Sequence, residues 1–199
     1  MIIVTSDPEF AGVKLLKNAA KELGVLCGVV AIDDPDLVEK LNNSNQIIFR
    51  IRTTTYATYK AIANKLRPGL NEELQAALVA FNKADSWKLM VENDIPTPNT
   101  NIAKVGRIPT FPVVLKPTIG NRGEGIVLAR TQSEYDQRLD AADKAGEQLI
   151  EQEFIAESAG TDKRLFVAGN KVVAAMKRTS NSETEFRANV HLGASASNY

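Results

Sequence analysis

The chain has 199 residues, an apolar content of 44%, and 24 basic residues balanced by 24 acidic ones. This length suits one ordinary domain or two small ones, and the balanced charge gives no sign of a surface that binds nucleic acid or a membrane. No apolar run approaches the ~20 residues that span a bilayer, and Met1–Thr5 lacks the basic start of a signal peptide, so we expect a soluble cytoplasmic protein.

The first fifty residues alternate between strand and helix patterns. Strands are predicted over residues 2–4, 25–31 and 46–51. A helix that starts at Asp7–Pro8 and a shorter one over residues 34–41 separate them. This order predicts an α/β domain with a small parallel sheet. Because residues 25–31 are apolar nearly throughout, we expect that strand to be covered on both faces.

Three helices follow, over residues 53–66, 71–81 and 83–92. Thr53–Thr55 can cap the first of them, and the last is expected to bury Trp87, Met90 and Val91. The sequence Ile95-Pro-Thr-Pro98 then reads as a connector. These features predict an N-terminal domain over residues 1–82, with the last helix leading into a second unit.

The second unit has the pattern of an α+β domain rich in antiparallel pairs. A helix is predicted over residues 133–145, and Gly169–Asn170 is a strong hairpin signal. The predicted strands cover residues 101–103, 113–116, 126–129, 148–153, 164–168 and 172–178.

A glycine-bearing loop joins two of these strands. Lys116 ends the first strand, and Gly120, Gly123 and Gly125 follow in the order G-x-x-G-x-G. Glycine lets main-chain N–H groups approach a phosphate, and a lysine adds a point charge to their dipoles. The order differs from the dinucleotide and kinase loops, and no Walker A ending is present. Taken alone, the loop fits either a phosphate site or a hairpin that merely turns.

The whole set of motifs resembles the ATP-grasp fold, and most closely the RimK-like carboxylate–amine ligases, which add glutamate or similar amino acids to a carboxyl end. The first half resembles the small α/β domain that precedes such modules. The resemblance divides the rest into a nucleotide-binding subdomain over 83–155 and the start of a second subdomain over 156–199. The matching strings are VLK at 114–116, GNRGEG at 120–125, EQEFI at 151–155, DKR at 162–164, VVAAMKR at 172–178 and EFRANVH at 185–191.

The resemblance implies a role for each matching residue. Lys83 and Lys116 would reach the phosphates of ATP, and the loop with Gly120, Gly123 and Gly125 would close over them. Glu153, Phe154 and Ile155 would line the adenine pocket, and Asp162 would hold the ribose. Arg178 would face the phosphates or the acyl-phosphate. Contacts on the phosphate and metal side would come from Arg187, Ala188 and Asn189.

Each of these residues also has a plainer interpretation. Lys83 could be a solvated helix lysine, and Asp162 with Arg164 could form an ordinary surface ion pair, worth about 0–1 kcal/mol. Arg178 and Arg187 could be solvated residues of a sheet. His191, the only histidine, is expected to be structural or substrate-facing rather than a metal ligand.

The activity implied by the resemblance is ATP-dependent formation of an amide or peptide bond. Phosphorylation turns a carboxylate into an acyl-phosphate, which an amine can attack. The implied partners are carboxylate and amine substrates, namely an amino acid, a peptide or a protein C-terminus, and the protein could form a homo-oligomer. Positioning and positive charge are the main contributions that such chemistry needs from the protein.

The resemblance also marks a segment that the printed sequence does not contain. In the family, an aspartate and a Glu-x-Asn pair further along hold two magnesium ions, so Mg²⁺ (or Mn²⁺) is expected with its ligands mostly outside these residues. A fragment of a longer enzyme, a site completed by a second chain, and a shortened relative are all consistent with this. The alternative function is therefore a catalytically incomplete ATP-binding or interaction module on the same fold.

Overall fold

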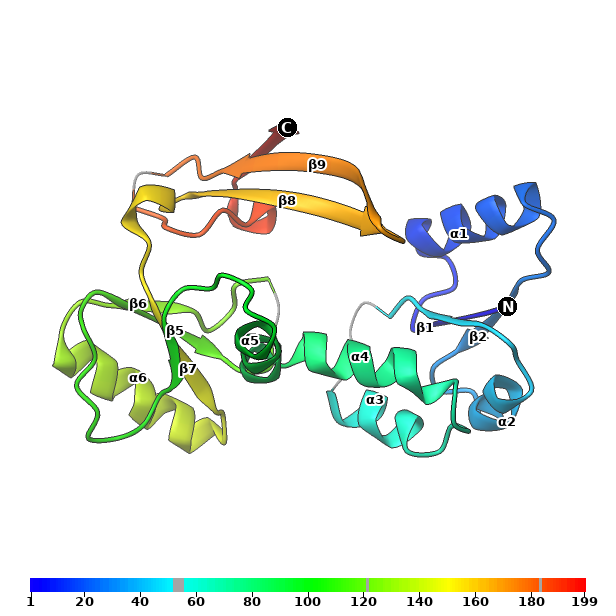
Figure 1. The fold of residues 1–199 in the computed structure, drawn as a ribbon, viewed down its shortest axis with the longest axis horizontal. Helices are drawn as coiled ribbons and strands as arrows, with labels where there is room; N and C mark the ends of the chain where they lie inside the picture. Colours follow the sequence, from blue (N-terminus) through cyan, green and yellow to red (C-terminus); the bar gives the residue numbers. More distant parts are fainter. Residues whose placement is uncertain (52–55, 121, 183) are drawn as a thin grey trace. The chain divides into compact units, whose positions relative to one another are not determined.

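The computed structural model describes residues 1–51, 56–120, 122–182 and 184–199, and forms two compact units, Met1–Phe81 and Asn82–Tyr199 (Figure 1). The proposed caps Thr53–Thr55 lie outside the described residues. No helix formed by these residues is both long and apolar enough to cross a membrane. The further division of the second unit at residue 155 stays a prediction.

The first unit is built on the expected parallel sheet. Strand β1 (Ile2–Thr5) lies between β2 (Gly28–Ala31) and β3 (Ile47–Phe49), and both pairings are parallel. Its core gathers apolar side chains such as Val4, Leu41 and Leu74, each fully buried. The helices of this unit are α1 (Ala11–Glu22), α2 (Leu37–Asn42), α3 (Tyr56–Ala63) and α4 (Asn71–Phe81).

Strand β2 is shorter and more exposed than its sequence predicts. It starts only at Gly28, and Leu26 is 92% exposed in the segment that follows α1. The expectation that residues 25–31 form a strand covered on both faces is wrong, because β2 lies at the edge of its sheet. Helix α1 also starts later than predicted, because Asp7 Oδ1 accepts the N–H of Glu9 in a turn before the helix.

The second unit contains an antiparallel sheet with the strand order β4-β7-β5-β6. Its strands are β4 (Thr100–Ile102), β5 (Val113–Pro117), β6 (Val127–Ala129) and β7 (Leu149–Glu153). Helix α6 (Gln132–Ala145) buries Tyr135, Leu139 and Ala142 against one face of this sheet. Because side chains alternate across a strand, Lys116 and Gln152 point to the opposite face.

A three-stranded antiparallel sheet completes the second unit, with the order β10-β9-β8. Strands β8 (Thr161–Ala168) and β9 (Lys171–Thr179) are joined by Gly169–Asn170, which confirms the predicted hairpin. Strand β10 (Ser195–Asn198) pairs with β9. Two short 3₁₀ turns flank this sheet, η1 (Ala156–Ser158) and η2 (Val190–Leu192).

Helix α5 (Lys83–Glu92) opens the second unit and begins with a clear cap. Asn82 Oδ1 accepts the N–H of Ala84 at 2.9 Å, which fixes the first turn and the position of Lys83. The expectation that α5 buries Met90 and Val91 is wrong, since they are 41% and 53% exposed. Trp87 and Met90 line an open cavity instead of a packed core.

A buried carboxylate organises the α6 face of the antiparallel sheet. Glu151 is 2% exposed, accepts the hydroxyl of Tyr135 at 2.6 Å and binds Arg107. Burial first, and then the hydrogen bond to Glu151, raise the pKa of Tyr135 to about 12. The hydroxyl therefore stays protonated and donates to the carboxylate, which a buried acceptor requires.

Removing this hydroxyl tests the network. We expect Tyr135→Phe to lower the free energy of unfolding by about 1–3 kcal/mol, because Glu151 loses a buried donor. Chemical denaturation of the second unit measures the change. Tyr199→Phe, at a residue that is 63% exposed, is the control and should have little effect. Equal stability of Tyr135→Phe and the unmodified protein would contradict a stabilising role for the network.

Candidate functional site

A cavity of about 280 Å³ lies in the second unit, on the face of the β4-β7-β5-β6 sheet that points away from α6. Both of the unit's sheets contribute to its lining, through β5, β7 and β8, together with residues 186–189. The predicted site residues that line it are Lys116, Glu153, Phe154, Ile155, Asp162, Arg187, Ala188 and Asn189.

Lys116 lines this cavity, and Lys83 lies close enough to it for their charges to interact, although Lys83 is not in the lining. Lys116 projects from β5 and binds Gln152 Oε1, while Lys83 Nζ donates to the carbonyls of Pro117 and Gly120, at 2.9 Å each. Burial lowers the pKa of Lys116, and the nearby charge of Lys83 lowers it further; burial also lowers the pKa of Lys83. Both ammonium groups are thus bound to neutral oxygen atoms.

Lys83 faces a second cavity of about 250 Å³. Its walls are mainly apolar and include Trp87, Met90 and Ile150. Lys116 and Gln152 line both cavities, so these two side chains form part of the boundary between them.

Two glycines of the loop adopt a left-handed backbone. Gly123 and Gly125 have φ values of +83° and +68°, where residues with a Cβ are strained. A Cβ on Gly125 would lie only 2.9 Å from Pro117 Cγ, and one on Gly123 only 3.0 Å from Asn189 Oδ1. The loop therefore packs against the end of β5 and against the segment that carries Asn189.

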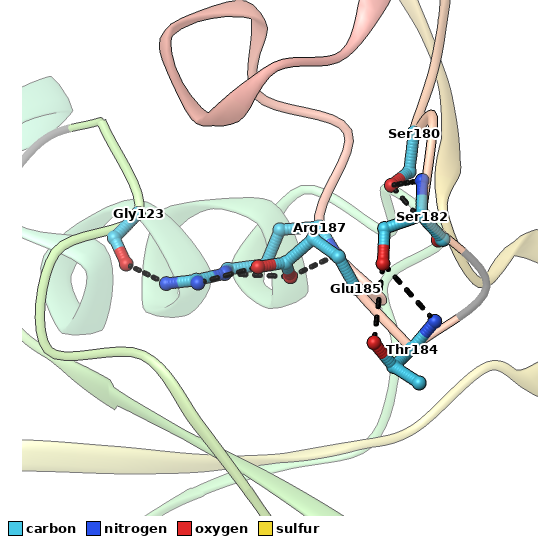
Figure 2. A network of polar contacts seen from close by, with 6 residues as sticks. All are labelled: Gly123, Ser180, Ser182, Thr184, Glu185 and Arg187. Carbon is cyan, nitrogen blue, oxygen red and sulfur yellow. Dashed lines mark hydrogen bonds and ion pairs between the residues drawn. The ribbon is translucent and has the colours of Figure 1, made fainter.

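Arg187 ties this loop to the segment that carries Glu185, as Figure 2 shows. Its Nη1 donates to the carbonyl of Gly123 at 2.8 Å, while Nε and Nη2 donate to the two oxygens of Glu185 at 2.8 and 2.6 Å. The hydrogen bond from Arg187 lowers the pKa of Glu185. The charge of Arg187 is consequently balanced within its own segment.

A turn just before Glu185 supports this arrangement (Figure 2). Ser180 Oγ accepts the N–H of Ser182 at 3.2 Å, and Ser182 Oγ accepts the N–H of Thr184 at 3.4 Å. Such local side-chain to main-chain bonds stabilise turns.

Asp162 and Arg178 face each other across β8 and β9. Arg178 Nε donates to Asp162 Oδ1 at 2.7 Å, and Nη2 donates to Oδ2. The plainer alternative paired Asp162 with Arg164, but Asp162 pairs with Arg178 instead. Asp162 lines the cavity, whereas Arg178 is not in the described lining. Arg178 contacts the cavity only indirectly, by binding Asp162.

Aromatic and apolar side chains form the wall beside the end of β7. The rings of Phe154 and Phe186 meet edge to face, with centroids 6.1 Å apart, and Ile155 lies next to them in the lining. Such a wall suits a flat aromatic base. Phe186 and Gln152 are not among the site residues predicted from the sequence, although strand alternation places Gln152 on the face of Lys116.

Within the described ranges, no three His, Cys, Asp or Glu side chains gather as a metal site requires. His191 lies in η2 and is not among the described cavity residues. The residues that are described therefore do not form a fitting Mg²⁺ site of their own, and none of them is assigned to a metal.

Comparison with known proteins identifies relatives of this chain. A family model described as the RimK-like ATP-grasp domain matches residues 80–199. A probable alpha-L-glutamate ligase of Histophilus somni is 39% identical, over 96% of this chain and 65% of its own length. Another, of Picosynechococcus sp., is 36% identical, over 79% of this chain and 56% of its own length. The chain thus spans less than two thirds of these relatives.

Solved structures share the fold at low sequence identity. A D-cycloserine synthetase aligns with a TM-score of 0.69 and 15% identity, over 100% of this chain and 75% of that one. A RimK domain protein from Sphaerobacter thermophilus gives 0.63 and 19%, over 96% and 76%. An N5-carboxyaminoimidazole ribonucleotide synthetase, solved as an ADP complex, gives 0.64 and 15%, over 90% and 54%. These likenesses confirm the predicted ATP-grasp fold class.

The backbone of the glycine loop gives the first test at the site. We expect Gly125→Ala to lower the stability of the second unit by about 1–2 kcal/mol, because alanine is strained at a left-handed φ and would also press on Pro117. Gly146→Ala is the matched control in the same unit: its φ of +66° is equally left-handed, but no atom lies within 4 Å of the added Cβ, so it should cost less than Gly125→Ala. Thermal unfolding of both variants checks the difference, which would vanish if the loop relaxed freely.

Proposed function

Because the chain belongs to the RimK-like ATP-grasp family, we propose that it carries the nucleotide site of an ATP-dependent carboxylate–amine ligase. The observation that carries the proposal is a single cavity, where Lys116 lies with Asp162 and with Arg187–Asn189. The names of the relatives, probable alpha-L-glutamate ligases, support an amino acid such as glutamate as one substrate. The other is a carboxylate carried by an amino acid, a peptide or a protein C-terminus.

In this proposal, ATP lies along the cavity from the aromatic wall to the lysines. Its adenine occupies the wall formed by Phe154, Ile155 and Phe186, with Glu153 at the edge. Asp162, held by Arg178, approaches the ribose. The phosphates approach Lys116, Lys83 and the glycine loop, where charge and main-chain N–H groups favour an anion. Residues 83–155 and 156–199 then act as the two subdomains that enclose the nucleotide.

The proposed reaction needs little covalent chemistry from the protein. A carboxylate oxygen of the first substrate attacks the γ-phosphorus, and the bond to ADP breaks. The amine of the second substrate then attacks the acyl carbon of the acyl-phosphate, loses a proton and releases phosphate. Cationic side chains stabilise the charge that develops on the phosphoryl oxygens. Lys116 and Lys83 are suited to this, while Arg187 and Asn189 hold the loop beside the phosphates.

A divalent cation is also part of the proposal, carried over from the family resemblance. Mg²⁺ supplies charge neutralisation between phosphate groups when it is bound. A homo-oligomer, too, stays a prediction from the resemblance.

Replacing Lys116 tests the phosphate assignment. ATP at about 100 times its Kd would stabilise a protein that binds it by about 2.7 kcal/mol. We expect Lys116→Ala to abolish this ATP-dependent rise in Tm, whereas Lys88→Ala, at an exposed lysine of α5, should retain it. Full ATP stabilisation of the Lys116 variant would show that the phosphates bind elsewhere.

A turnover assay separates a ligase from a binding module on the same fold. We expect ADP to be released when the intact gene product is mixed with ATP, Mg²⁺ and a panel of amino acids and peptides. Coupled detection of ADP, with mass spectrometry of the products, measures the ligation. If ATP binds but no member of the panel releases ADP, the non-catalytic alternative gains support over the ligase.

A further inference from the structure

Beneath the cavity, three polar side chains form a continuous hydrogen-bonded chain. Lys116 donates to Gln152 Oε1, Gln152 Nε2 donates to Thr100 Oγ1 at 2.9 Å, and the Thr100 hydroxyl donates to the carbonyl of Pro98 at 2.8 Å. The chain runs across β5, β7 and β4, three adjacent strands of one sheet.

The strand register places these side chains on one face. Thr100 lies directly opposite Gln152 on β7, and Gln152 lies opposite Val114 on β5. Lys116 is two residues beyond Val114, so it is the diagonal neighbour of Gln152 on the same face. The strand register therefore fixes the spacing between the side chains of Lys116, Gln152 and Thr100.

The donors and acceptors of these hydrogen bonds are determined at both ends of the series, at Lys116 and at Pro98. An ammonium group can only donate, so the group of Gln152 that faces Lys116 must be its carbonyl oxygen. The hydroxyl of Thr100 uses its proton on Pro98 and accepts the amide N–H₂ of Gln152. If the amide of Gln152 were turned around, its N–H₂ group would face the ammonium of Lys116, and two donors cannot form a hydrogen bond with each other.

Thr100 occupies an unusual position in this chain. It is 3% exposed and is not among the described residues that line either cavity. Its hydroxyl has no contact with the space where a ligand would bind, yet it sets the orientation of a residue that lines that space. Its influence on the cavity therefore passes through Gln152.

We propose that Thr100 is a positioning residue, which acts through Gln152 to hold the ammonium group of Lys116 at the phosphate end of the cavity. The inference rests on the proposed function, in which Lys116 contacts the phosphates of ATP. Lys83 repels Lys116, and a lysine side chain has four rotatable bonds. Without a fixed acceptor, the ammonium would move away from Lys83 and lose the geometry that a phosphate needs.

Phosphate-dependent binding is the quantity that distinguishes positioning from general stability. Calorimetry of the full chain with ATP and with adenosine separates the contribution of the phosphates from that of the base and ribose. We expect Thr100→Val to weaken ATP binding about tenfold, the effect of about one charge-assisted hydrogen bond, and to leave adenosine binding unchanged. Thr100→Ser, which keeps the hydroxyl, should restore ATP affinity to within about twofold of the unmodified protein.

Thr97→Val is the matched control. Thr97 also donates its hydroxyl to the Pro98 carbonyl, at 2.9 Å, but the chain to Lys116 does not pass through it. Its ATP affinity should therefore stay unchanged. If Thr100→Val does not fold, Thr100→Ala provides the same test, because alanine also lacks the hydroxyl that accepts from Gln152.

The outcomes separate this inference from the proposed function. If Lys116→Ala loses phosphate-dependent affinity and Thr100→Val retains it, the positioning role is overturned while the phosphate site stands. If Thr100→Val weakens ATP and adenosine equally, Thr100 shapes the whole cavity and the positioning role is again overturned. If Lys116→Ala retains full ATP affinity, the phosphate assignment itself fails.

Discussion

The candidate site depends on how the second unit holds Lys83 and Lys116 close together, with Lys116 at the boundary between the two cavities. Burial and mutual repulsion both disfavour the charged form of Lys116, and burial disfavours that of Lys83. Their hydrogen-bond partners are the carbonyls of Pro117 and Gly120 and the amide oxygen of Gln152. These partners stabilise the ammonium groups without neutralising them, so the pair retains positive charge for an anion.

The arginines beside the cavity, unlike the lysines, are paired with carboxylates. Arg178 is paired with Asp162, and Arg187 with Glu185, each through two donors of its guanidinium group. A planar fork matched to a carboxylate gives directional bonds, so these pairs fix geometry more than they supply charge. Arg187 uses a further donor to hold the glycine loop. Charge and shape at this site are therefore provided by different residues.

The sheet that carries Lys116 also separates two kinds of polar group. On the α6 face, the buried Glu151 accepts the hydroxyl of Tyr135 and pairs with the exposed Arg107, which links α6 to β7. On the other face, Gln152 and Thr100 serve Lys116. The two-residue period of β7 thus assigns alternate residues to the core and to the cavity.

Local sequence determined the elements and much of the site. The alternation around Lys116, the glycines of its loop and the Gly169–Asn170 turn all act over a few residues, and the structure has the predicted hairpins at both places. What local pattern could not decide was which side chains pair. Arg178 rather than Arg164 binds Asp162 because the register of β8 and β9 places them opposite each other. Arg187 binds Gly123 because segments distant in sequence approach each other there. The exposure of Leu26, Met90 and Val91 likewise depended on where an edge strand and a cavity lie, which only the tertiary structure decides.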